Sequence, residues 1–311
     1  MAERVRITDV APRDGLQGEP APVSTADKRR LITALQDAGV DAIEVTSFVR
    51  PDLIPQLADA GELVASLAEV KRPGIEYIAL VPNERGLVGA LAANDAAGSR
   101  VIDTIAVFAS ASETFSQKNI NTDIDGSLER FEPVIDRALT EGLRVRAYVS
   151  CVIACPFEGV IDPEDVGSLV LRLAELGAHE IDLGDTIGAG DEATTAMMLT
   201  EVMGTLGDSD LLPALTLHPH DTFGRASDCV RAALDLGLRS FDGAAGGLGG
   251  CPFASTPQRR APGNIATSTL RRTIEAAGFE TSIDPSKLAI ADAVASRILA
   301  DASARSIGDA S

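Results

Sequence analysis

The chain is poor in several residue types, and each shortage excludes a class of protein. Among its 311 residues there is no Trp, and there are only two Tyr, three His and four Cys. The cysteines are too few and too scattered for a disulfide framework, and they favour a reducing, cytoplasmic location. They are Cys151, Cys155, Cys229 and Cys251. Cys151 and Cys155 have no matching second pair, which argues against a structural zinc site.

Long apolar runs and positive charge are also scarce. No stretch approaches the roughly 20 apolar residues of a membrane span, and residues 1–6 lack the apolar core of a signal peptide. There are 27 Lys and Arg against 46 Asp and Glu, which gives a net charge of −19. This balance argues against binding to nucleic acids or anionic membranes. An anionic substrate would need local arginines or a metal ion to hold it.

What the chain does have is a regular alternation of β-rich and helical segments. The expected strands cover residues 5–10, 42–46, 77–81, 104–108, 144–150, 180–183, 214–217 and 240–243. The expected helices cover residues 25–37, 54–68, 84–97, 127–141, 163–176, 191–206, 226–236, 265–277 and 285–302.

Eight strand–helix units without a linker predict an α/β protein with one (β/α)8 TIM barrel. We expect a single catalytic domain over residues 1–311, with the barrel at about 4–280 and a C-terminal helical extension at about 284–303. A doubly wound open sheet is the alternative. It normally has a phosphate-binding loop after its first strand, and residues 12–15 do not resemble one.

Two of the three histidines, His218 and His220, lie one residue apart at the end of an expected strand. Alternation along a strand places both imidazoles on the same face, close enough to bind one ion. Leu215 and Leu217 lead into the pair, and a polar turn follows. Because barrel strands carry active-site residues at their C-terminal ends, this pair predicts a metal site at the barrel mouth.

Other polar residues follow the expected strands at the same end. They are Arg13 and Asp14, Glu44 and Ser47, Asp182 and Asp185, and, after a glycine-rich run at 243–250, Cys251 and Asn264. Carboxylate, imidazole and amide donors together suit Mg²⁺ or Mn²⁺ better than an ion that prefers thiolates. A single carboxylate at a strand end can equally cap the next helix.

Several motifs occur in order over roughly the first 270 residues. The first is residues 10–17 (Val-Ala-Pro-Arg-Asp-Gly-Leu-Gln), and the seventh strand contributes residues 218–224 (His-Pro-His-Asp-Thr-Phe-Gly). The other segments are residues 44–49, 117–121, 150–152, 155–159, 183–188 and 246–252. This collinear set resembles the hydroxymethylglutaryl-CoA lyase family, whose metal-dependent barrels are related to isopropylmalate and homocitrate synthases.

The resemblance implies a carbon–carbon lyase that depends on a divalent metal, Mg²⁺ or Mn²⁺. Such an enzyme cleaves 3-hydroxy-3-methylglutaryl-CoA, or a close 3-hydroxy-acyl-CoA, to acetyl-CoA and acetoacetate by retro-Claisen chemistry. By resemblance, the metal ligands are Asp14, His218, His220 and Asn264. The implied substrate-binding residues are Arg13, Gln17, Ser47 and Thr186.

Catalytic roles also carry over by resemblance. Asp14 would remove the hydroxyl proton, Arg13 would face the developing negative oxygen, and Cys251 would protonate the enolate carbon. Glu44 would support the site, Asp185 would orient a water or His218, and His218 would act beside the metal. A cytoplasmic enzyme of leucine degradation is implied, with a homodimer as the default expectation.

Some positions depart from the family pattern. Gly18 and Asp182 replace other residues, Ser268 and Thr269 stand where an acidic pair is usual, and the run from Cys251 to Asn264 is longer. These changes suggest a different acyl group, such as a citramalyl-CoA or a longer-branched glutaryl-CoA, and a contact of Arg259 or Arg260 with a CoA phosphate or substrate carboxylate.

Three other functions are alternatives to the lyase. An acetyl-CoA-condensing synthase is disfavoured by the first motif and by the end of the chain at residue 311. A carboxyltransferase is disfavoured because none of the four lysines, Lys28, Lys71, Lys118 and Lys287, falls on an expected strand. A catalytically silent binding scaffold is disfavoured because the whole set of implied catalytic residues is present.

Overall fold

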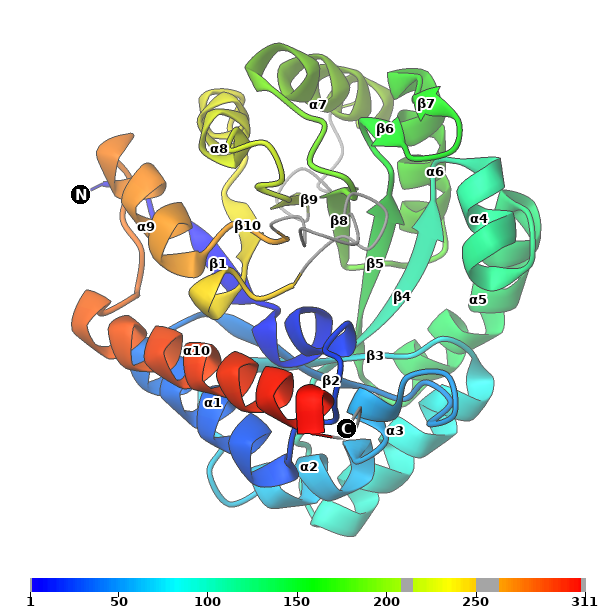
Figure 1. The fold of residues 1–311 in the computed structure, drawn as a ribbon. Helices are drawn as coiled ribbons and strands as arrows, with labels where there is room; N and C mark the ends of the chain where they lie inside the picture. The colour runs from blue at the N-terminus through cyan, green and yellow to red at the C-terminus, as the bar shows by residue number, and fades with distance from the viewer. Residues whose placement is uncertain (1, 208–214, 250–262, 309–311) are drawn as a thin grey trace.

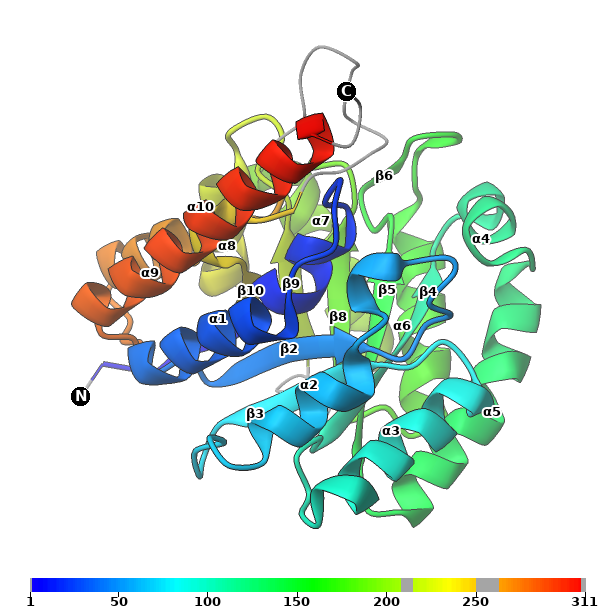
Figure 2. The same ribbon diagram turned by 60° about the horizontal axis from the view of Figure 1, so that its bottom comes forward.

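A computed structural model describes residues 2–207, 215–249 and 263–308 of the chain, with side chains described as far as residue 302. Eight parallel strands close into a barrel in the order β1-β10-β9-β8-β5-β4-β3-β2 (Figures 1 and 2). They are β1 (Arg6–Asp9), β2 (Ala42–Ser47), β3 (Glu76–Leu80), β4 (Thr104–Ser110), β5 (Arg144–Ser150), β8 (Glu180–Asp185), β9 (Leu215–Pro219) and β10 (Ser240–Gly243). Because β1 pairs with both β10 and β2, the predicted TIM barrel is confirmed and the open sheet is wrong.

Helices surround the strands, as Figure 1 shows. They are α1 (Thr25–Ala38), α2 (Ala60–Leu67), α3 (Glu84–Ala97), α4 (Glu113–Ile120), α5 (Ile124–Thr140), α6 (Pro163–Glu175), α7 (Glu192–Leu206), α8 (Ala226–Asp235), α9 (Thr267–Ala276) and α10 (Pro285–Gly308). Local capping sets several of these limits. The Ser24 hydroxyl caps the start of α1, and Gly39 ends it in the left-handed conformation with φ 87°.

The structure differs from the sequence prediction mainly in short elements. The helix expected over residues 54–68 is divided into a 3-10 turn, η2 (Pro55–Leu57), and α2. The sequence pattern does not predict α4, because only Phe115 and Ser116 are buried on it and so little helical periodicity exists. It also misses a hairpin of two-residue strands, β6 (Ala154–Cys155) and β7 (Gly159–Val160), which are too short to show alternation.

The barrel interior holds an apolar cluster next to a group of buried charges. The cluster consists of Ala42, Ile78, Leu80, Ala106 and Tyr148 from β2 to β5. Beside it, the fully buried Arg146 of β5 lies with its guanidinium carbon 4.9 Å from the centroid of the Tyr148 ring and forms ion pairs with Glu180, Asp182 and Asp242. Buried charges are tolerated only when they are paired, so this group of four acts as one unit inside the barrel. A larger apolar core lies between the strands and the helices.

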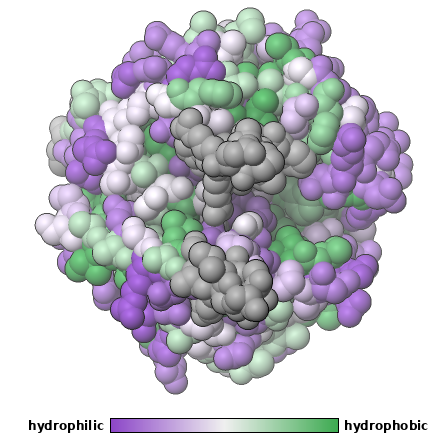
Figure 3. Space-filling view, in the orientation of Figure 1, coloured by the Kyte–Doolittle hydropathy of each residue, from purple (hydrophilic) through white to green (hydrophobic). Residues whose placement is uncertain are grey.

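The C-terminal helix α10 packs along α1 on the outside of the barrel (Figure 2). Its Asp292 carboxylate accepts the Gly246 N–H at 2.7 Å, which ties α10 to a short turn, η4 (Ala245–Gly247), after β10. None of the helices in the described part of the chain is long and apolar enough to cross a membrane. The space-filling view shows a face that is hollowed near its middle (Figure 3).

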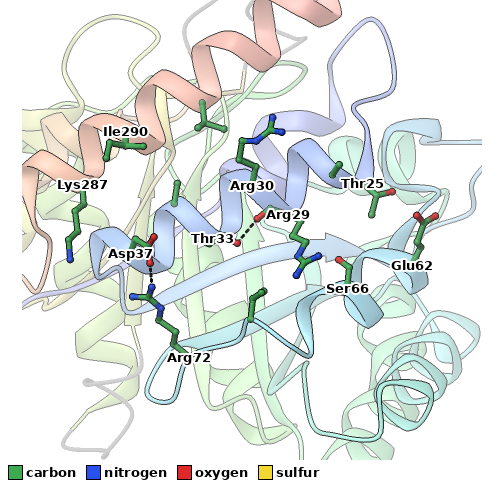
Figure 4. Close-up of a pocket in the computed structure, with 14 residues that line it drawn as sticks. Thr25, Arg29, Arg30, Thr33, Asp37, Glu62, Ser66, Arg72, Lys287 and Ile290 are labelled. Carbon is green, nitrogen blue, oxygen red and sulfur yellow. Dashed lines mark hydrogen bonds and ion pairs between the residues drawn. The ribbon is translucent and has the colours of Figure 1, made fainter.

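One groove lies on the outside of the barrel, away from the predicted site. It has a volume of about 990 Å³, and α1, α2 and α10 border it (Figure 4). Arg29 and Arg72 lie on it together with apolar residues such as Ile290. None of the predicted site residues lines this groove, so it is separate from the predicted metal site.

Candidate metal centre and active site

Three of the predicted metal ligands meet at the C-terminal end of the barrel. Asp14 lies in η1 (Ala11–Gly15) after β1, and His218 and His220 lie at the end of β9. Each offers one ligand atom, and these atoms all lie within 4.8 Å of one another. The two imidazole Nε2 atoms are 3.2 Å apart. Two ring nitrogens that face each other beside a carboxylate are a donor set that fits a divalent cation.

The turn that carries Asp14 is a π-helical turn, a feature that often marks functional sites. The Gly15 N–H donates to the Val10 carbonyl at 3.1 Å, and the Ala11 N–H donates to Asp9 Oδ1 at 3.0 Å. A Cβ on Gly15 would lie only 2.7 Å from the Cβ of Leu248. Glycine is therefore required where this turn touches the glycine-rich segment after β10.

Asn264, the fourth predicted ligand, lies against the same carboxylate. Its Nδ2 donates to Asp14 Oδ2 at 2.8 Å and to the Leu248 carbonyl at 3.0 Å. An antiparallel bridge between Asn264 and His220 holds its backbone beside β9. The Asn264 side-chain amide directs its nitrogen at Asp14. The amide group must therefore flip before its oxygen can face an ion.

Asp242 of β10 orients His218. Its Oδ2 lies 2.9 Å from Nδ1 of His218, which leaves Nε2 directed at His220. Arg146 Nη2 donates to both Asp242 oxygens, at 2.7 and 2.6 Å. A carboxylate on the far nitrogen fixes the tautomer and the ring direction of a ligating histidine.

Burial lowers the pKa of both imidazoles, yet the two pKa values move apart. For His218, burial is outweighed by the hydrogen bond to Asp242 and by the charges of Asp182, Asp242 and Asp14, which raise its pKa to about 9. For His220, the charge of His218 adds to burial, and its pKa falls to about 4. At neutral pH His218 is thus charged and His220 neutral, and a cation that binds both rings must displace the extra proton of His218.

Arg13 lies beside Asp14 with its side chain buried. Its Nη2 is 2.6 Å from Glu44 Oε2, its Nη1 is 3.1 Å from Asp14 Oδ1, and its guanidinium carbon is 5.4 Å from the centroid of the Tyr148 ring. Burial lowers the pKa of Arg13, but the charges of Glu44 and Asp14 outweigh it and keep the pKa above its usual range. A fixed, permanently charged guanidinium can neutralise charge that develops on a nearby oxygen.

Sequence reasoning missed the buried charges beneath the histidines. The sequence predictions do not include Arg146 or Asp242 among the site residues, and they place Asp182 only among the polar residues that follow the strands at the barrel mouth. The structure instead buries Asp182 completely against Arg146, with its Oδ2 3.9 Å from His218 Nδ1. Burial, and then the charge of Asp242, raise the pKa of Asp182 well above its usual range. The sequence does hold one signal for these residues, which is a charged side chain at a strand position that faces the barrel interior.

The remaining predicted residues lie around this centre. Asp185 accepts the N–H groups of Ala189 and Gly190 at 3.0 and 2.7 Å, so it shapes the turn after β8. The carboxylate that contacts His218 Nδ1 belongs to Asp242 and not to Asp185. Gln17 Nε2 donates to Asp14 Oδ1 at 2.9 Å, and Thr186 Oγ1 accepts the Cys151 N–H at 2.8 Å. Ser47 is buried at the end of β2. Cys251, Arg259 and Arg260 lie outside the described residues.

Comparison with known proteins identifies the family. The HMGL-like family model matches residues 4–294. The chain belongs to the HMGL-like family. Among HMGL-like proteins, a 3-hydroxy-3-isohexenylglutaryl-CoA/hydroxy-methylglutaryl-CoA lyase of Pseudomonas aeruginosa is 40% identical over 284 residues, which are 91% of this chain and 89% of that protein.

Solved HMGL-like structures share the whole fold. The HMG-CoA lyase of Brucella melitensis is 46% identical, with a TM-score of 0.87 over 96% of this chain and 99% of that one. An HMG-CoA lyase of Acinetobacter baumannii, solved in complex with coenzyme A and 3-methylmalate, is 34% identical, with a TM-score of 0.85 over 96% of this chain and 92% of that one. The resemblance noted in the sequence motifs is therefore confirmed.

Proposed function

We propose that this protein is a divalent-metal-dependent lyase that cleaves 3-hydroxy-3-methylglutaryl-CoA to acetyl-CoA and acetoacetate. The observation that carries the proposal is the meeting of Asp14, His218 and His220 beside the buried Arg13, in a chain of the HMGL-like family. The names of the similar lyases and the coenzyme A bound in one of them support the same substrate class.

Asp14, His218, His220 and Asn264 would hold the ion, and their oxygen and nitrogen donors favour Mg²⁺ or Mn²⁺. When bound there, such an ion lowers the pKa of a substrate hydroxyl and neutralises charge on its oxygen. For Asp14, burial raises the pKa, but the charges of Arg13 and the two histidines outweigh it and lower the pKa. Asp14 is therefore ionised at neutral pH and available to accept the hydroxyl proton.

The reaction breaks the bond between C2 and C3 of the acyl group. Asp14 takes the proton of the C3 hydroxyl, the C3 oxygen forms the ketone of acetoacetate, and the electron pair of the broken bond passes to C2 as a thioester enolate. Arg13 compensates the negative charge on oxygen during this step. A proton delivered to C2, by Cys251 in our proposal, completes acetyl-CoA. Glu44 holds Arg13 in place through their 2.6 Å contact.

The acyl group, compartment and assembly are finer parts of the proposal. The Pseudomonas aeruginosa relative is named for both a methyl and an isohexenyl substrate, so a longer branch at C3 is the second candidate, ahead of a citramalyl-CoA. One extra methylene in a pocket changes binding by only about 1–3 kcal/mol and leaves no motif. We place the enzyme in the cytoplasm, in leucine degradation and as a homodimer; the three described cysteines, all free thiols, suit a reducing compartment.

The test is a cleavage assay on 3-hydroxy-3-methylglutaryl-CoA with added Mg²⁺ or Mn²⁺, in which acetoacetate and acetyl-CoA are both measured. His220→Ala should abolish turnover, because it removes one of the two facing imidazoles. His179→Ala is the matched control, since the His179 ring accepts the Val145 N–H at 3.2 Å at the opposite end of the barrel strands. Condensation of acetyl-CoA with a keto acid, in place of cleavage, would favour a synthase instead.

A further inference from the structure

A continuous line of buried charges runs through the barrel beneath the metal centre. It begins at Glu180, the first residue of β8, at the end of the barrel opposite the site. From there it passes through Arg146 of β5, the neighbouring strand in Figure 1, and through Asp242 of β10 to His218. Asp242 touches a predicted metal ligand, so its role follows from that contact. The role of Glu180, at the far end of the line, has to be sought through the groups between.

Glu180 lies too deep in the barrel to touch an ion or a substrate. Gly184, four residues further along β8, pairs with His218. At about 3.3 Å per residue, Glu180 therefore lies roughly 13 Å below the level of His218. Its side chain is only 10% exposed, and a buried carboxylate is costly unless it is paired. Any effect of Glu180 on the metal centre must pass through its partner, Arg146.

The two ends of the Arg146 guanidinium bind different partners. Its Nη1 is 3.2 Å from Glu180 Oε1 and donates to the Thr8 hydroxyl at 3.3 Å. Its Nη2 donates to Asp182, and to both oxygens of Asp242 at 2.7 and 2.6 Å. A guanidinium is a rigid, planar fork of donors, so a partner that fixes Nη1 also fixes the direction of Nη2. Glu180 thus helps to decide which end of Arg146 reaches Asp242.

Glu180 is itself held through both of its oxygens. Thr216 Oγ1 lies 2.6 Å from Glu180 Oε1 and 2.8 Å from Ser240 Oγ, so Thr216 donates to the carboxylate and accepts from Ser240. Arg6 Nη2 lies 3.9 Å from the other oxygen, Oε2. These three partners come from β9, β10 and β1, which are fixed strands of the barrel. The Glu180 carboxylate is therefore a rigid support for Arg146.

The position of Arg146 matters to the histidine above it. Asp242, which accepts from Arg146, lies 2.9 Å from Nδ1 of His218. The Arg146 guanidinium carbon also lies 4.9 Å from the centroid of the Tyr148 ring, whose centroid is 6.2 Å from that of the His218 ring. Burial lowers the pKa of Arg146, but the charges of Asp242 and Glu180 outweigh it and keep the pKa well above its usual range. Arg146 is thus a permanent cation that contacts Glu180 on one side and the supports of His218 on the other.

We propose that Glu180 is a positioning residue for the metal centre, which it supports by holding Arg146 in place behind Asp242. The proposal rests on the proposed function, because it concerns the ion that His218 would help to bind. Without the Glu180 charge, Arg146 is neutralised from its Nη2 end alone and is free to turn. Asp242 then shares more of its charge with the guanidinium and holds the His218 ring less firmly.

The test is Mn²⁺ binding to the metal-free protein, measured by calorimetry for the parent protein and for Glu180→Gln. Glutamine keeps the shape of the side chain, but it removes the charge and can direct an amide nitrogen at Arg146. Loss of a group that directly orients a ligating histidine weakens metal binding by about 10–100-fold, and Glu180 acts through such a group, so we expect the lower end of that range. The Kd for Mn²⁺ should rise about tenfold, which corresponds to about 1.4 kcal/mol.

Glu76→Gln is the matched control. Glu76 is the first residue of β3, at the same end of the barrel, and its side chain is 17% exposed. Its ion pairs among the described residues are with Arg6 and Arg144. Urea unfolding in a chelator should show a loss of stability for both variants, but only Glu180→Gln should weaken Mn²⁺ binding. Equal losses of Mn²⁺ affinity would mean that charge at this end of the barrel acts at a distance, and would overturn the proposal.

Nuclear magnetic resonance separates this proposal from the proposed function. The proton between His218 Nδ1 and Asp242 should give a low-field signal that disappears or moves in Asp242→Asn. In the metal-free protein, Glu180→Gln should move this signal and Glu76→Gln should not, whether or not any thioester is cleaved. If the parent protein cleaves its substrate with Mn²⁺ but Glu180→Gln keeps the parental signal and Kd, the proposed function stands and Glu180 has no positioning role.

A second variant keeps the proposal testable if Glu180→Gln does not fold. Glu180→Asp retains the charge and withdraws the carboxylate from Arg146 by the length of one methylene. Its Kd for Mn²⁺ should exceed that of the parent protein, and the His218 signal should move in the same direction as in Glu180→Gln. A folded Glu180→Asp protein with the parental Kd and the parental signal would overturn the proposal.

Discussion

Replacing Asp242 with Asn tests how the buried charges control the metal centre. Asp242 accepts from Arg146 through both oxygens and holds His218 Nδ1 at 2.9 Å. An Asn in the same place can keep an oxygen on His218, but its amide nitrogen then faces the Arg146 guanidinium, donor against donor. The change thus removes one negative charge and one charge-assisted hydrogen bond, and it keeps the shape of the side chain.

Two magnitudes follow from Asp242→Asn. Loss of a hydrogen bond to a charged group should reduce the free energy of unfolding by about 1.5–3 kcal/mol. Loss of the carboxylate behind a ligating histidine should weaken Mn²⁺ binding by about 10–100-fold. Asp228→Asn is the control, because Asp228 on α8 is half-buried and its ion pair among the described residues is with Arg231. It should change neither quantity.

The same substitution should flatten the pH dependence of the metal-free protein. The pKa of His218 is raised from 6.5 to about 9 in the folded state. The resulting stabilisation is fully present below pH 6.5 and is lost as the pH rises through about 9. A shift of about 2.5 pKa units (9 − 6.5) corresponds to roughly 3 kcal/mol.

Two experiments measure the loss of stability, the weaker Mn²⁺ binding and the flatter pH dependence. They are urea unfolding in the presence of a chelator at pH 6.5 and pH 9.5, and calorimetry of Mn²⁺ binding. In the Asp242→Asn variant the free energy of unfolding should fall much less between these pH values than in the parent protein, because the carboxylate that raises the pKa of His218 is gone. A folded variant that binds Mn²⁺ as tightly as the parent protein and keeps the full pH dependence would refute this reasoning.

Three further changes test other parts of the site. Burial raises the pKa of Asp9 from 3.8 to about 7, so the folded state holds a proton that the unfolded chain releases, and stability declines between about pH 4 and 7. Asp9→Asn should remove that decline, roughly 4 kcal/mol, in urea titrations at pH 4.5 and 8, and an unchanged decline would contradict the shift. Gly15→Ala should cost about 1–3 kcal/mol in thermal unfolding and weaken Mn²⁺ binding, because its Cβ would meet Leu248, whereas Gly61→Ala should do neither. Arg13→Lys should lower kcat for cleavage by about 10²–10³-fold with Mn²⁺ affinity retained, and a normal kcat would exclude Arg13 from charge stabilisation.

The fold was largely predictable, because barrel strands and helices leave strong periodic signals. All eight barrel strands overlap segments chosen from the sequence, and α3 (Glu84–Ala97) has the expected limits. The short elements were not predictable, since a turn of five residues such as η1 or a two-residue strand carries no periodicity. Their positions depend on contacts with distant segments, such as that of Gly15 with Leu248.

The site was predictable where local spacing fixes geometry. Alternation places His218 and His220 together, and the structure shows their nitrogens 3.2 Å apart. The same rule would put Glu44 and Ser47 on opposite faces, and only the bulge in β2 brings them to one side. Arg146 was missed because a buried arginine looks like a surface one until the carboxylates from β8 and β10 are seen around it.

The most direct test of the central claim is a metal titration of carbon–carbon cleavage. The parent protein is freed of metal with a chelator and mixed with 3-hydroxy-3-methylglutaryl-CoA, and Mn²⁺ is added in steps while both products are measured. The account predicts no cleavage before Mn²⁺, equal amounts of acetyl-CoA and acetoacetate as one ion per chain is added, and none at any Mn²⁺ level with His220→Ala. Cleavage that persists without metal, or in the His220 variant, would contradict it.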